Sequence, residues 1–300
     1  SGYNHFHWYP RLEKYVRQIR PDIFHIEEEH YSFVTYQAIK LAKKYNIKCL
    51  FVTWQNIYKK YPFPFSRIER YNLKNADYAI AGSKEVKNVL AGKGFDNKRI
   101  SEIPLGVDTT MFHKIESTEL MSKLCLEAFT IGYLGRFVVE KGVIDLLKAV
   151  SKIKDKFNLL LVGDGELRNK ITIEGKHLGI SDNIRVVDSI PSSQVPNYLN
   201  CMDCLVLPSR TTRKWKEQFG RVLTEAMSCE VPVIGSDSGE IPNVIDDCGL
   251  IFREGDVDDL STKIKLLINN RDLRMELAKK SRQRVLDNFT QEKVARETYN

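Results

Sequence analysis

Residues 217–227 read Glu-Gln-Phe-Gly-Arg-Val-Leu-Thr-Glu-Ala-Met, and this stretch is the most informative part of the 300-residue chain. Its pattern predicts a helix from Gly220, with Glu217 just before the helix and Glu225 inside it. An apolar strand, residues 231–235, and a glycine turn at Gly239 follow. Carboxylates accept hydrogen bonds from sugar hydroxyls, and backbone N–H groups at a helix N-terminus bind phosphate. The stretch therefore predicts a site for a polyhydroxylated, phosphorylated ligand.

Strand and helix patterns alternate along the whole chain, with a polar stretch at 113–127 that predicts a linker. The predicted strands are 22–26, 47–53, 78–81, 100–103, 129–134, 159–162, 184–187, 204–207, 231–235 and 250–252. The predicted helices are 31–45, 66–73 with Ser66 as its cap, 84–91 with Ser83 as its cap, 141–151, 166–178, 191–200, 220–228, 256–269, 271–289 and 291–299. This alternation predicts two doubly wound α/β domains, residues 1–113 and 114–300, whose parallel sheets are covered on both faces and face a cleft. Ligands then bind at the C-terminal ends of the strands.

The composition is that of an ordinary globular protein, with 42% hydrophobic and 28% charged residues. No apolar run approaches the roughly 20 residues of a spanning helix, and no signal peptide is visible. The six cysteines are scattered, and only Cys201 and Cys204 are closely spaced, without a second pair to complete a zinc site. We expect reduced thiols in a cytoplasmic protein. Because the chain starts at Ser1 and its first α/β block is short, we also expect a longer native protein.

The positive charge is concentrated in the first part of the chain. Residues 1–113 hold 18 Lys and Arg against 11 Asp and Glu, whereas the remainder holds 28 of each. Such an excess suggests an anionic partner, for example a lipid leaflet or a phosphorylated acceptor. The alternative is a solvated, lysine-rich surface without a specific partner.

Four charged side chains stand out in the second part. Arg136 and Lys141 follow the strand 129–134, where two converging cations could bind a diphosphate without a metal ion. Glu217 lies near a helix N-terminus, where the helix dipole favours a carboxylate. Glu225 lies among apolar residues, so its charge needs a partner, and ribose hydroxyls would serve. The alternative for each is an ordinary surface charge.

Several motifs together resemble glycosyltransferase family 4, also called glycosyl transferases group 1. They span nearly the whole chain and comprise residues 76–83, 103–108, 135–142, 161–167, 205–209, 217–227 and 231–234. The resemblance implies the GT-B fold, in which two Rossmann-like domains face a cleft and the C-terminal domain holds most of a sugar nucleotide. The first domain would here be incomplete, because its first strands and their Gly-rich loop are missing from the sequence.

The resemblance also implies residue roles. Arg136 and Lys141 would hold the donor diphosphate and assist its departure, Glu217 would position the donor sugar, and these three would form the catalytic set. Glu225 would bind the ribose, and Val187 and Asp188 would border the nucleobase. The remaining donor contacts would come from Gly135, Phe219, Gly220, Arg221 and Val222. The implied reaction is metal-independent transfer of a hexose or N-acetylhexosamine with retention of configuration, without a cofactor besides the nucleotide-sugar substrate. Glycoside hydrolysis needs both carboxylates at one bond, and two helical turns separate these two.

The acceptor side is expected in the first domain. Gln55 stands where the family often has His, and Glu27 and Glu28 follow a strand beside the cleft. Residues 58–65 interleave aromatic and basic side chains, which suits a membrane interface, a single-stranded nucleic-acid groove or a plain packed loop. We expect a glycan or lipid-linked acceptor, no nucleic acid, and peripheral contact with the inner face of an anionic membrane. Two alternatives are a non-catalytic sugar-nucleotide-binding module, which Gln55 favours, and a GT-B nucleotide-sugar epimerase.

Overall fold

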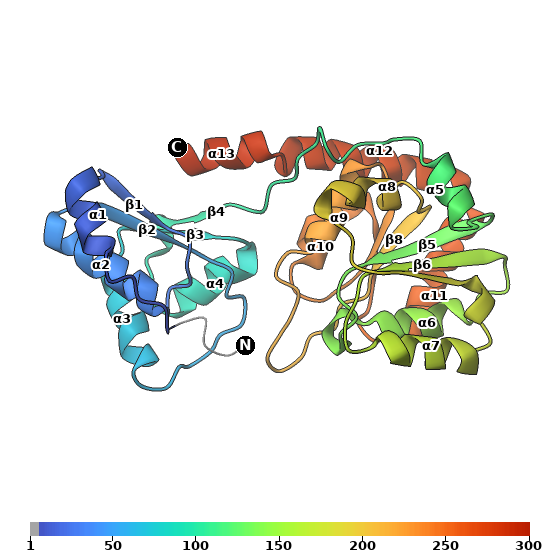
Figure 1. The fold of residues 1–300 in the computed structure, drawn as a ribbon, viewed down its shortest axis with the longest axis horizontal. Coiled ribbons are helices and arrows are strands. Elements are labelled where there is room, and N and C mark those ends of the chain that lie inside the picture. Colours follow the sequence, from blue (N-terminus) through green and yellow to red (C-terminus); the bar gives the residue numbers. More distant parts are fainter. Residues whose placement is uncertain (1–5) are drawn as a thin grey trace. The chain divides into compact units, whose positions relative to one another are not determined.

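The computed structural model describes residues 6–300, which form two compact units that divide between Pro104 and Leu105 (Figure 1). Residues 105–113, placed by the sequence pattern in the first domain, lie in the second unit. The N–H of Val107 donates to the carbonyl of Phe289 at 2.7 Å, and Val107 forms a β-bridge with Thr290. Arg282 donates to the carbonyl of Phe112 at 2.9 Å. These bonds join the segment to the C-terminal helices.

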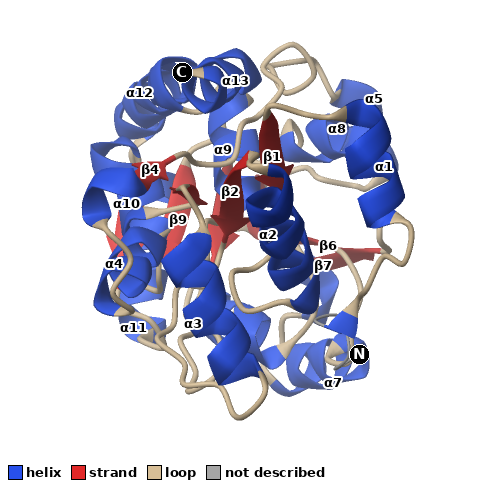
Figure 2. Ribbon diagram, turned by 90° about the vertical axis from the view of Figure 1, so that its left-hand side faces the viewer, coloured by secondary structure: helices blue, strands red, loops and turns tan. Residues whose placement is uncertain are grey.

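The first unit contains a four-stranded parallel sheet in the order β1-β2-β3-β4. Its strands are β1 (Ile23–Ile26), β2 (Lys48–Thr53), β3 (Tyr78–Ala81) and β4 (Ile100–Glu102), and its helices are α1 (Leu12–Ile19), α2 (Phe33–Tyr45), α3 (Phe65–Asn75) and α4 (Lys84–Gly92). Helix α2 packs on β1 and β2 (Figure 2). Ser83 caps α4 as predicted, because its hydroxyl accepts the N–H of Val86. The predicted cap at Ser66 is wrong, since α3 begins one residue earlier, after Pro64.

The strands of the first sheet are buried to different extents. In β2, Cys49, Phe51 and Thr53 are buried, whereas Lys48 is exposed and the alternate apolar positions are half-buried. Ile23 on β1 is 61% exposed. This period of two is typical of a strand with one partly open face, whereas β3 is buried at three successive residues, Ala79, Ile80 and Ala81.

The second unit contains a six-stranded parallel sheet in the order β10-β9-β8-β5-β6-β7. Its strands are β5 (Phe129–Leu134), β6 (Phe157–Val162), β7 (Ile184–Val187), β8 (Cys204–Leu207), β9 (Val233–Ser236) and β10 (Leu250–Phe252). Its helices are α5 (Thr118–Lys123), α6 (Val143–Val150), α7 (Arg168–His177), α8 (Val195–Leu199), α9 (Arg221–Ser228), α10 (Ile241–Ile245), α11 (Val257–Asn269), α12 (Arg271–Asn288) and α13 (Gln291–Tyr299). Strands β6, β8 and β9 are buried along their whole length, as expected of a sheet covered on both faces.

The strand order of this second sheet reverses between β5 and β8, which are neighbours. From β5 the chain runs outward through β6 and β7, and it then returns to the other side of β5 with β8. In open α/β sheets ligands bind at the carboxyl ends of the strands next to such a reversal. The predicted fold class, two parallel α/β sheets of which the first is smaller, is confirmed.

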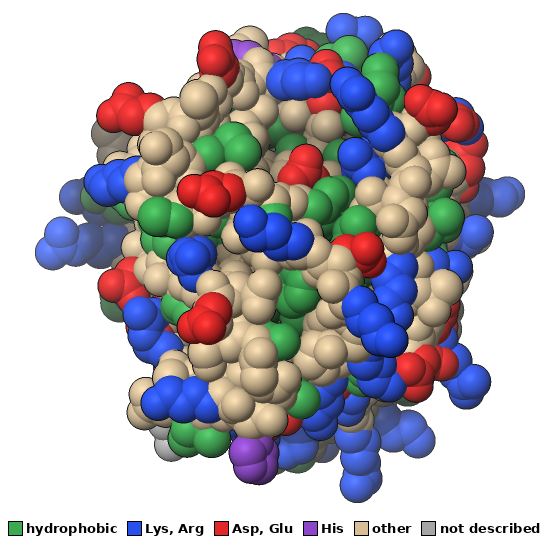
Figure 3. Space-filling model, turned by 90° about the vertical axis from the view of Figure 1, so that its right-hand side faces the viewer, with side chains coloured by type: hydrophobic (Ala, Val, Ile, Leu, Met, Phe, Trp, Pro, Cys, Tyr) green, Lys and Arg blue, Asp and Glu red, His purple; other side chains and the backbone are tan. Residues whose placement is uncertain are grey.

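The described surface is mainly polar and charged on the face that Figure 3 shows. None of the described helices has the length and apolar content needed to cross a bilayer. Figure 3 shows one face of the molecule on which basic side chains alternate with acidic ones, and apolar side chains form only small separate groups. All six cysteines are free thiols, and only Cys125 is exposed.

Candidate functional site

The carboxyl ends of β5 and β8 bring together two loops that lie far apart in the sequence. Gly142, which precedes α6, adopts a left-handed conformation with φ 67°, and a Cβ on it would lie 1.8 Å from the carbonyl oxygen of Pro208. Only glycine allows this approach. The loop after β5 is therefore pressed against the loop after β8.

Three side chains meet between these two loops. The Nζ of Lys141 lies 2.6 Å from Oε2 of Glu217, and the hydroxyl of Ser209 donates to the same oxygen at 2.8 Å. Glu217 is only 6% exposed. The ring of Trp215 lies 5.1 Å from the Lys141 ammonium, in cation–π geometry. Two residues predicted for separate parts of a ligand thus form one buried ion pair.

The backbone of Glu217 is held by the glycine turn after β9. Gly239 has φ 57°, and a Cβ on it would lie 2.0 Å from the Glu217 carbonyl oxygen. The N–H of Glu240 donates to that same oxygen at 3.2 Å. The strand and turn after the helix, quoted first in the sequence, therefore fix the position of the carboxylate that precedes the helix.

Arg136 lies at the same edge of the sheet, and its side chain is exposed. Its guanidinium makes no ion pair with any described carboxylate, so its positive charge is uncompensated. Its backbone is fixed, because the buried Tyr133 hydroxyl donates to the Arg136 carbonyl at 2.6 Å. Burial, and to a lesser extent the charge of Glu217, raise the pKa of the Tyr133 hydroxyl above its usual value. The hydroxyl therefore stays protonated and keeps donating.

Glu225 lies one turn after Arg221 on α9 and is half-buried. No hydrogen bond or ion pair joins its carboxylate to another described residue. Burial raises the pKa of Glu225 to about 7, although the nearby Arg221 charge acts in the opposite direction. A buried carboxyl that is half protonated near neutral pH can accept hydrogen bonds from a ligand and ionise on doing so.

The residues between Glu217 and Glu225 contribute mainly backbone groups to the candidate site. The Phe219 side chain is buried and packs edge-on against Phe289, with ring centroids 5.7 Å apart. Gly220 adopts φ 82° and forms the N-cap of α9 without any side-chain cap. The N-terminus of α9, with Arg221 and Val222 in its first turn, is thereby presented without a capping carboxylate or hydroxyl.

The other predicted donor residues lie at neighbouring strand ends. The carbonyl of Val187, at the end of β7, accepts the N–H of Gly163 at 2.9 Å. Asp188 is exposed and lies 2.6 Å from Nη1 of Arg168, so its carboxylate is already paired. Gly135 follows β5, and its N–H donates to the carbonyl of Val162 at 3.0 Å.

A second ion pair, which the sequence did not indicate, supports the loop after β8. Arg210 contacts Asp145 of α6 through two nitrogens, of which Nη2 lies 2.7 Å from Oδ1. Arg210 also donates its N–H to the carbonyl of Glu140 at 2.8 Å. Both contacts tie the Ser209 loop to the segment that carries Lys141. No local pattern marks them, because the partners are about 65–70 residues apart.

The first unit places the expected acceptor residues at the ends of β1 and β2. The Gln55 amide is occupied at both ends, since it donates to the Ile57 carbonyl at 2.7 Å and accepts from the Tyr61 hydroxyl at 3.1 Å. Glu27 is exposed and lies 3.1 Å from His25. Glu28 is half-buried, and its carbonyl accepts from the Thr35 hydroxyl.

Glu29 and His30, which directly follow the expected acceptor residues Glu27 and Glu28, lie at the centre of a buried polar network. Glu29 accepts the N–H of Trp54 at 3.0 Å and also contacts the Thr53 hydroxyl. His30 is fully buried between that hydroxyl at 3.2 Å and Glu69 at 3.0 Å. Within the described residues, no group of three or more His, Cys, Asp or Glu could hold a metal ion.

Comparison with known families identifies two matching profiles. Residues 118–284 match "Glycosyl transferases group 1", and residues 1–111 match "Glycosyltransferase Family 4".

Curated relatives cover part of the chain. A capsular polysaccharide biosynthesis glycosyltransferase of Staphylococcus aureus is 34% identical over 177 residues, which are 57% of this chain and 45% of the relative. An N-acetyl-alpha-D-glucosaminyl L-malate synthase of Bacillus anthracis is 29% identical over 232 residues, covering 75% of this chain and 59% of the relative. The chain spans about half the length of the curated relatives it matches.

Solved structures share the fold at low sequence identity. HepE of Anabaena, in complex with UDP, superposes with a TM-score of 0.87 at 16% identity, over 97% of this chain and 81% of that one. A glycosyltransferase of Rickettsia africae gives a TM-score of 0.82 at 22% identity, over 96% and 78% of the two chains.

Proposed function

Because this chain belongs to the glycosyl transferases group 1 family and has the GT-B fold, we propose that it transfers a sugar from a nucleotide-diphosphate sugar to a glycan or lipid-linked acceptor, with retention of configuration. The observation that carries the proposal is the buried Lys141–Glu217 pair beside the uncompensated Arg136, at the reversal point of the second sheet. Cations for a diphosphate and a carboxylate for hydroxyls lie together there, as a nucleotide sugar requires.

The two cations would act on the leaving group. Arg136 offers a planar fork for phosphate oxygens, and the N-terminus of α9 adds backbone donors. Lys141 would turn from Glu217 towards the diphosphate when the donor binds, before the reaction begins. Such fixed charges stabilise a developing anion without reorganising solvent. The bond between the sugar C1 and the diphosphate oxygen breaks, and the acceptor oxygen bonds to C1 on the same face.

Glu217 would position the sugar and would not attack it. Its Oε2 already accepts hydrogen bonds from Lys141 and Ser209, which lowers its nucleophilicity. The acceptor proton would pass to the departing phosphate oxygen. Glu225 would accept the ribose hydroxyls, and Val187 and Asp188 would border the base. On the acceptor side, Glu27 and Glu28 would contact acceptor hydroxyls while Gln55 holds its own loop.

The test is substitution of Glu217 by Gln in the full chain, after a panel of UDP- and GDP-sugars has identified the donor by thermal shift. We expect the variant to fold and to lose transfer by at least about a hundredfold, the scale of losing one positioned polar group at a reacting centre. Glu127→Gln, at an exposed glutamate of the same unit, is the matched control. Undiminished transfer by the Glu217 variant would contradict the proposed role.

A non-catalytic sugar-nucleotide-binding module is the second candidate, and the full engagement of the Gln55 amide favours it. Calorimetry and a donor-hydrolysis assay on one preparation separate the two functions. Donor binding without hydrolysis or transfer, with a range of glycan and lipid-linked acceptors, would support the second candidate.

A further inference from the structure

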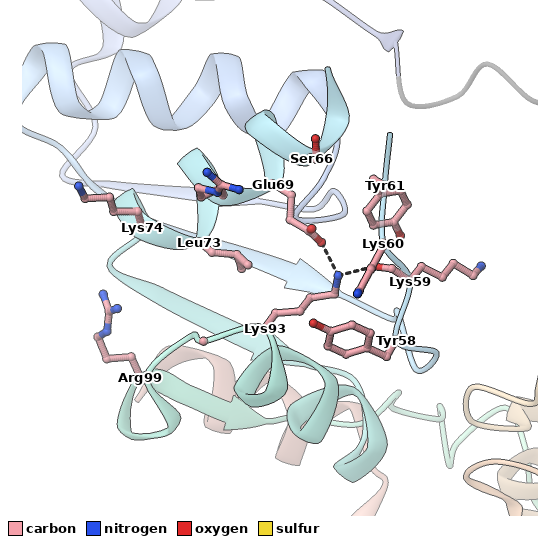
Figure 4. Close-up of a pocket in the computed structure, with 12 residues that line it drawn as sticks. Tyr58, Lys59, Lys60, Tyr61, Ser66, Glu69, Leu73, Lys74, Lys93 and Arg99 are labelled. Atoms are coloured by element: carbon pink, nitrogen blue, oxygen red, sulfur yellow. Dashed lines mark hydrogen bonds and ion pairs between the residues drawn. The ribbon is translucent and has the colours of Figure 1, made fainter. Parts of the chain in front are cut away.

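A pocket of about 640 Å³ lies within the first unit, and it is lined in part by Tyr61, whose hydroxyl donates to Gln55 (Figure 4). Its walls come from residues 58–61, helix α3 and the segment 93–99, which connects α4 to β4. Its volume lies within the usual range for small-molecule sites, roughly 300–1,000 Å³. Six basic side chains line it, against the single acidic residue Glu69: Lys59, Lys60, Arg70, Lys74, Lys93 and Arg99.

The floor of this pocket is formed by an ion pair, Lys93–Glu69, whose two charges cancel. The Lys93 ammonium is buried, and it lies 2.7 Å from Glu69 and 2.7 Å from the carbonyl of Lys59 (Figure 4). The rings of Tyr58 and Tyr61 lie 4.8 and 5.3 Å from it. Glu69 is held in turn by the buried His30. The one acidic residue in the lining is therefore already bonded, through Oε1, to both Lys93 and His30.

Arg99 is also tied to the protein. It donates to the Ala76 carbonyl at 2.9 Å and lies 3.8 Å from Asp96. Lys60, Arg70 and Lys74 differ from it, because none of the three makes an ion pair with a described Asp or Glu. Arg70 and Lys74 are four residues apart on α3, where like charges face each other and repel. A bound anion would relieve this repulsion.

We propose that this pocket binds a phosphate-bearing ligand, with Lys60, Arg70 and Lys74 as its cationic contacts. Arg and Lys are the side chains that recognise phosphate oxygens, and two or three of them around one cavity suit a group of more than one negative charge. The tyrosines Tyr58 and Tyr61 form the wall next to the balanced floor, which leaves an uncharged surface for the part of the ligand that carries the phosphate. The phosphate can belong to a soluble molecule or to a lipid headgroup.

The experiment uses the full chain carrying Arg136→Gln, which removes the free cation of the second unit. Inorganic pyrophosphate is titrated into this protein by calorimetry, and sedimentation with vesicles of phosphatidylglycerol, or of phosphatidylcholine alone, is measured alongside. The test variant adds Arg70→Gln and Lys74→Gln, both at exposed positions of α3 where Gln is a good helix former. The matched control adds Lys84→Gln and Lys98→Gln instead, which removes the same charge from exposed positions outside the pocket.

We expect the Arg70/Lys74 variant to bind one of these probes at least about tenfold more weakly than the Lys84/Lys98 control, since each charged hydrogen bond is worth about a tenfold change. Loss for pyrophosphate assigns the pocket to a soluble phosphate. Loss for phosphatidylglycerol vesicles alone assigns it to a lipid headgroup. Equal binding by the two variants for every probe would overturn the proposal. Because the readout is binding within the first unit, it is independent of whether sugar transfer is observed.

Discussion

Replacing Glu225 with Gln should remove a link between pH and donor binding. In the free protein burial raises the pKa of Glu225 from an ordinary 4.5 to about 7, so about half of the molecules carry a proton there at pH 7. If the ribose hydroxyls donate to this carboxyl, they favour its ionised form. Binding and deprotonation are then coupled, and affinity rises as the pH rises through 7.

The size of the effect follows from the position of the pKa. At pH 8 the group is already ionised, whereas at pH 6 about nine molecules in ten must lose a proton before they bind. The dissociation constant of the nucleotide sugar should therefore be about tenfold weaker at pH 6 than at pH 8. At pH 7 binding should release about half a proton. The donor diphosphate is a diester that stays ionised in this range, so it adds no proton of its own.

Calorimetry in buffers of different ionisation enthalpy measures both quantities. Glu225→Gln should bind with the same affinity at pH 6 and pH 8 and release no protons, whereas Glu127→Gln should behave as wild type. The free protein gives a second readout. Because the folded pKa is the higher one, the free energy of unfolding should fall as the pH rises from about 4.5 to 7, by up to about 3 kcal/mol, and Glu225→Gln should abolish that slope. An equal pH dependence of donor binding in wild type and Glu225→Gln would refute the reasoning.

Three further predictions follow from the site geometry. Lys141→Met leaves the buried Glu217 without its cation and should lower the free energy of unfolding, measured by urea denaturation, by about 2–3 kcal/mol. The double variant Lys141→Met/Glu217→Gln should recover part of this loss. A double variant as unstable as Lys141→Met would contradict the pairing. Gly142→Ala places a methyl group 1.8 Å from the Pro208 carbonyl oxygen, whereas Gly179→Ala, at a similar φ of 68°, has open space around it. Both changes cost about 1–2 kcal/mol for the left-handed backbone, so the Gly142 variant should melt at the lower temperature because of the added clash. Equal melting temperatures would show that the two loops are not in close contact. Tyr133→Phe removes the hydrogen bond to the Arg136 carbonyl and should lower the free energy of unfolding by about 1 kcal/mol. It should also weaken donor binding measured by calorimetry. Unchanged binding would show that this hydrogen bond is not needed to position Arg136 for the donor.

The elements of the second sheet could be predicted from the sequence because each strand is a short, mainly apolar run. Strands 129–134, 184–187, 204–207 and 250–252 begin and end where the apolar runs do, and the pattern is confirmed at each. Helix α1 was missed although Leu12, Val16 and Ile19 recur at helical spacing, because it is short and only Val16 is buried. Helix α5 was read as linker for a similar reason, since it has no buried residue.

The individual residues of the candidate site could be predicted from the sequence, but the contacts between them could not. Arg136, Lys141, Glu217 and Glu225 were identified from their places at strand ends and helix starts. The ion pair between Lys141 and Glu217 joins residues 76 positions apart, and it exists because β5 and β8 are neighbours in the sheet. Ser209, Trp215 and Tyr133 carry no local signal, because a hydroxyl or an indole in a loop is ordinary until its partner is known. The residue-level roles towards donor and acceptor stay predictions.

The ion pair between Lys141 and Glu217 bears on which ligands the site retains. A bare phosphate can draw Lys141 away, but it then leaves the buried Glu217 carboxylate without its cation. An intact nucleotide sugar supplies phosphate oxygens to the lysine and hydroxyl groups to the glutamate at the same time. The Lys141–Glu217 pair is neutral within itself, and exchanging its two partners is favourable only for a ligand with both kinds of group. We therefore expect the spent nucleotide to be held less firmly than the donor, which would favour turnover over product inhibition.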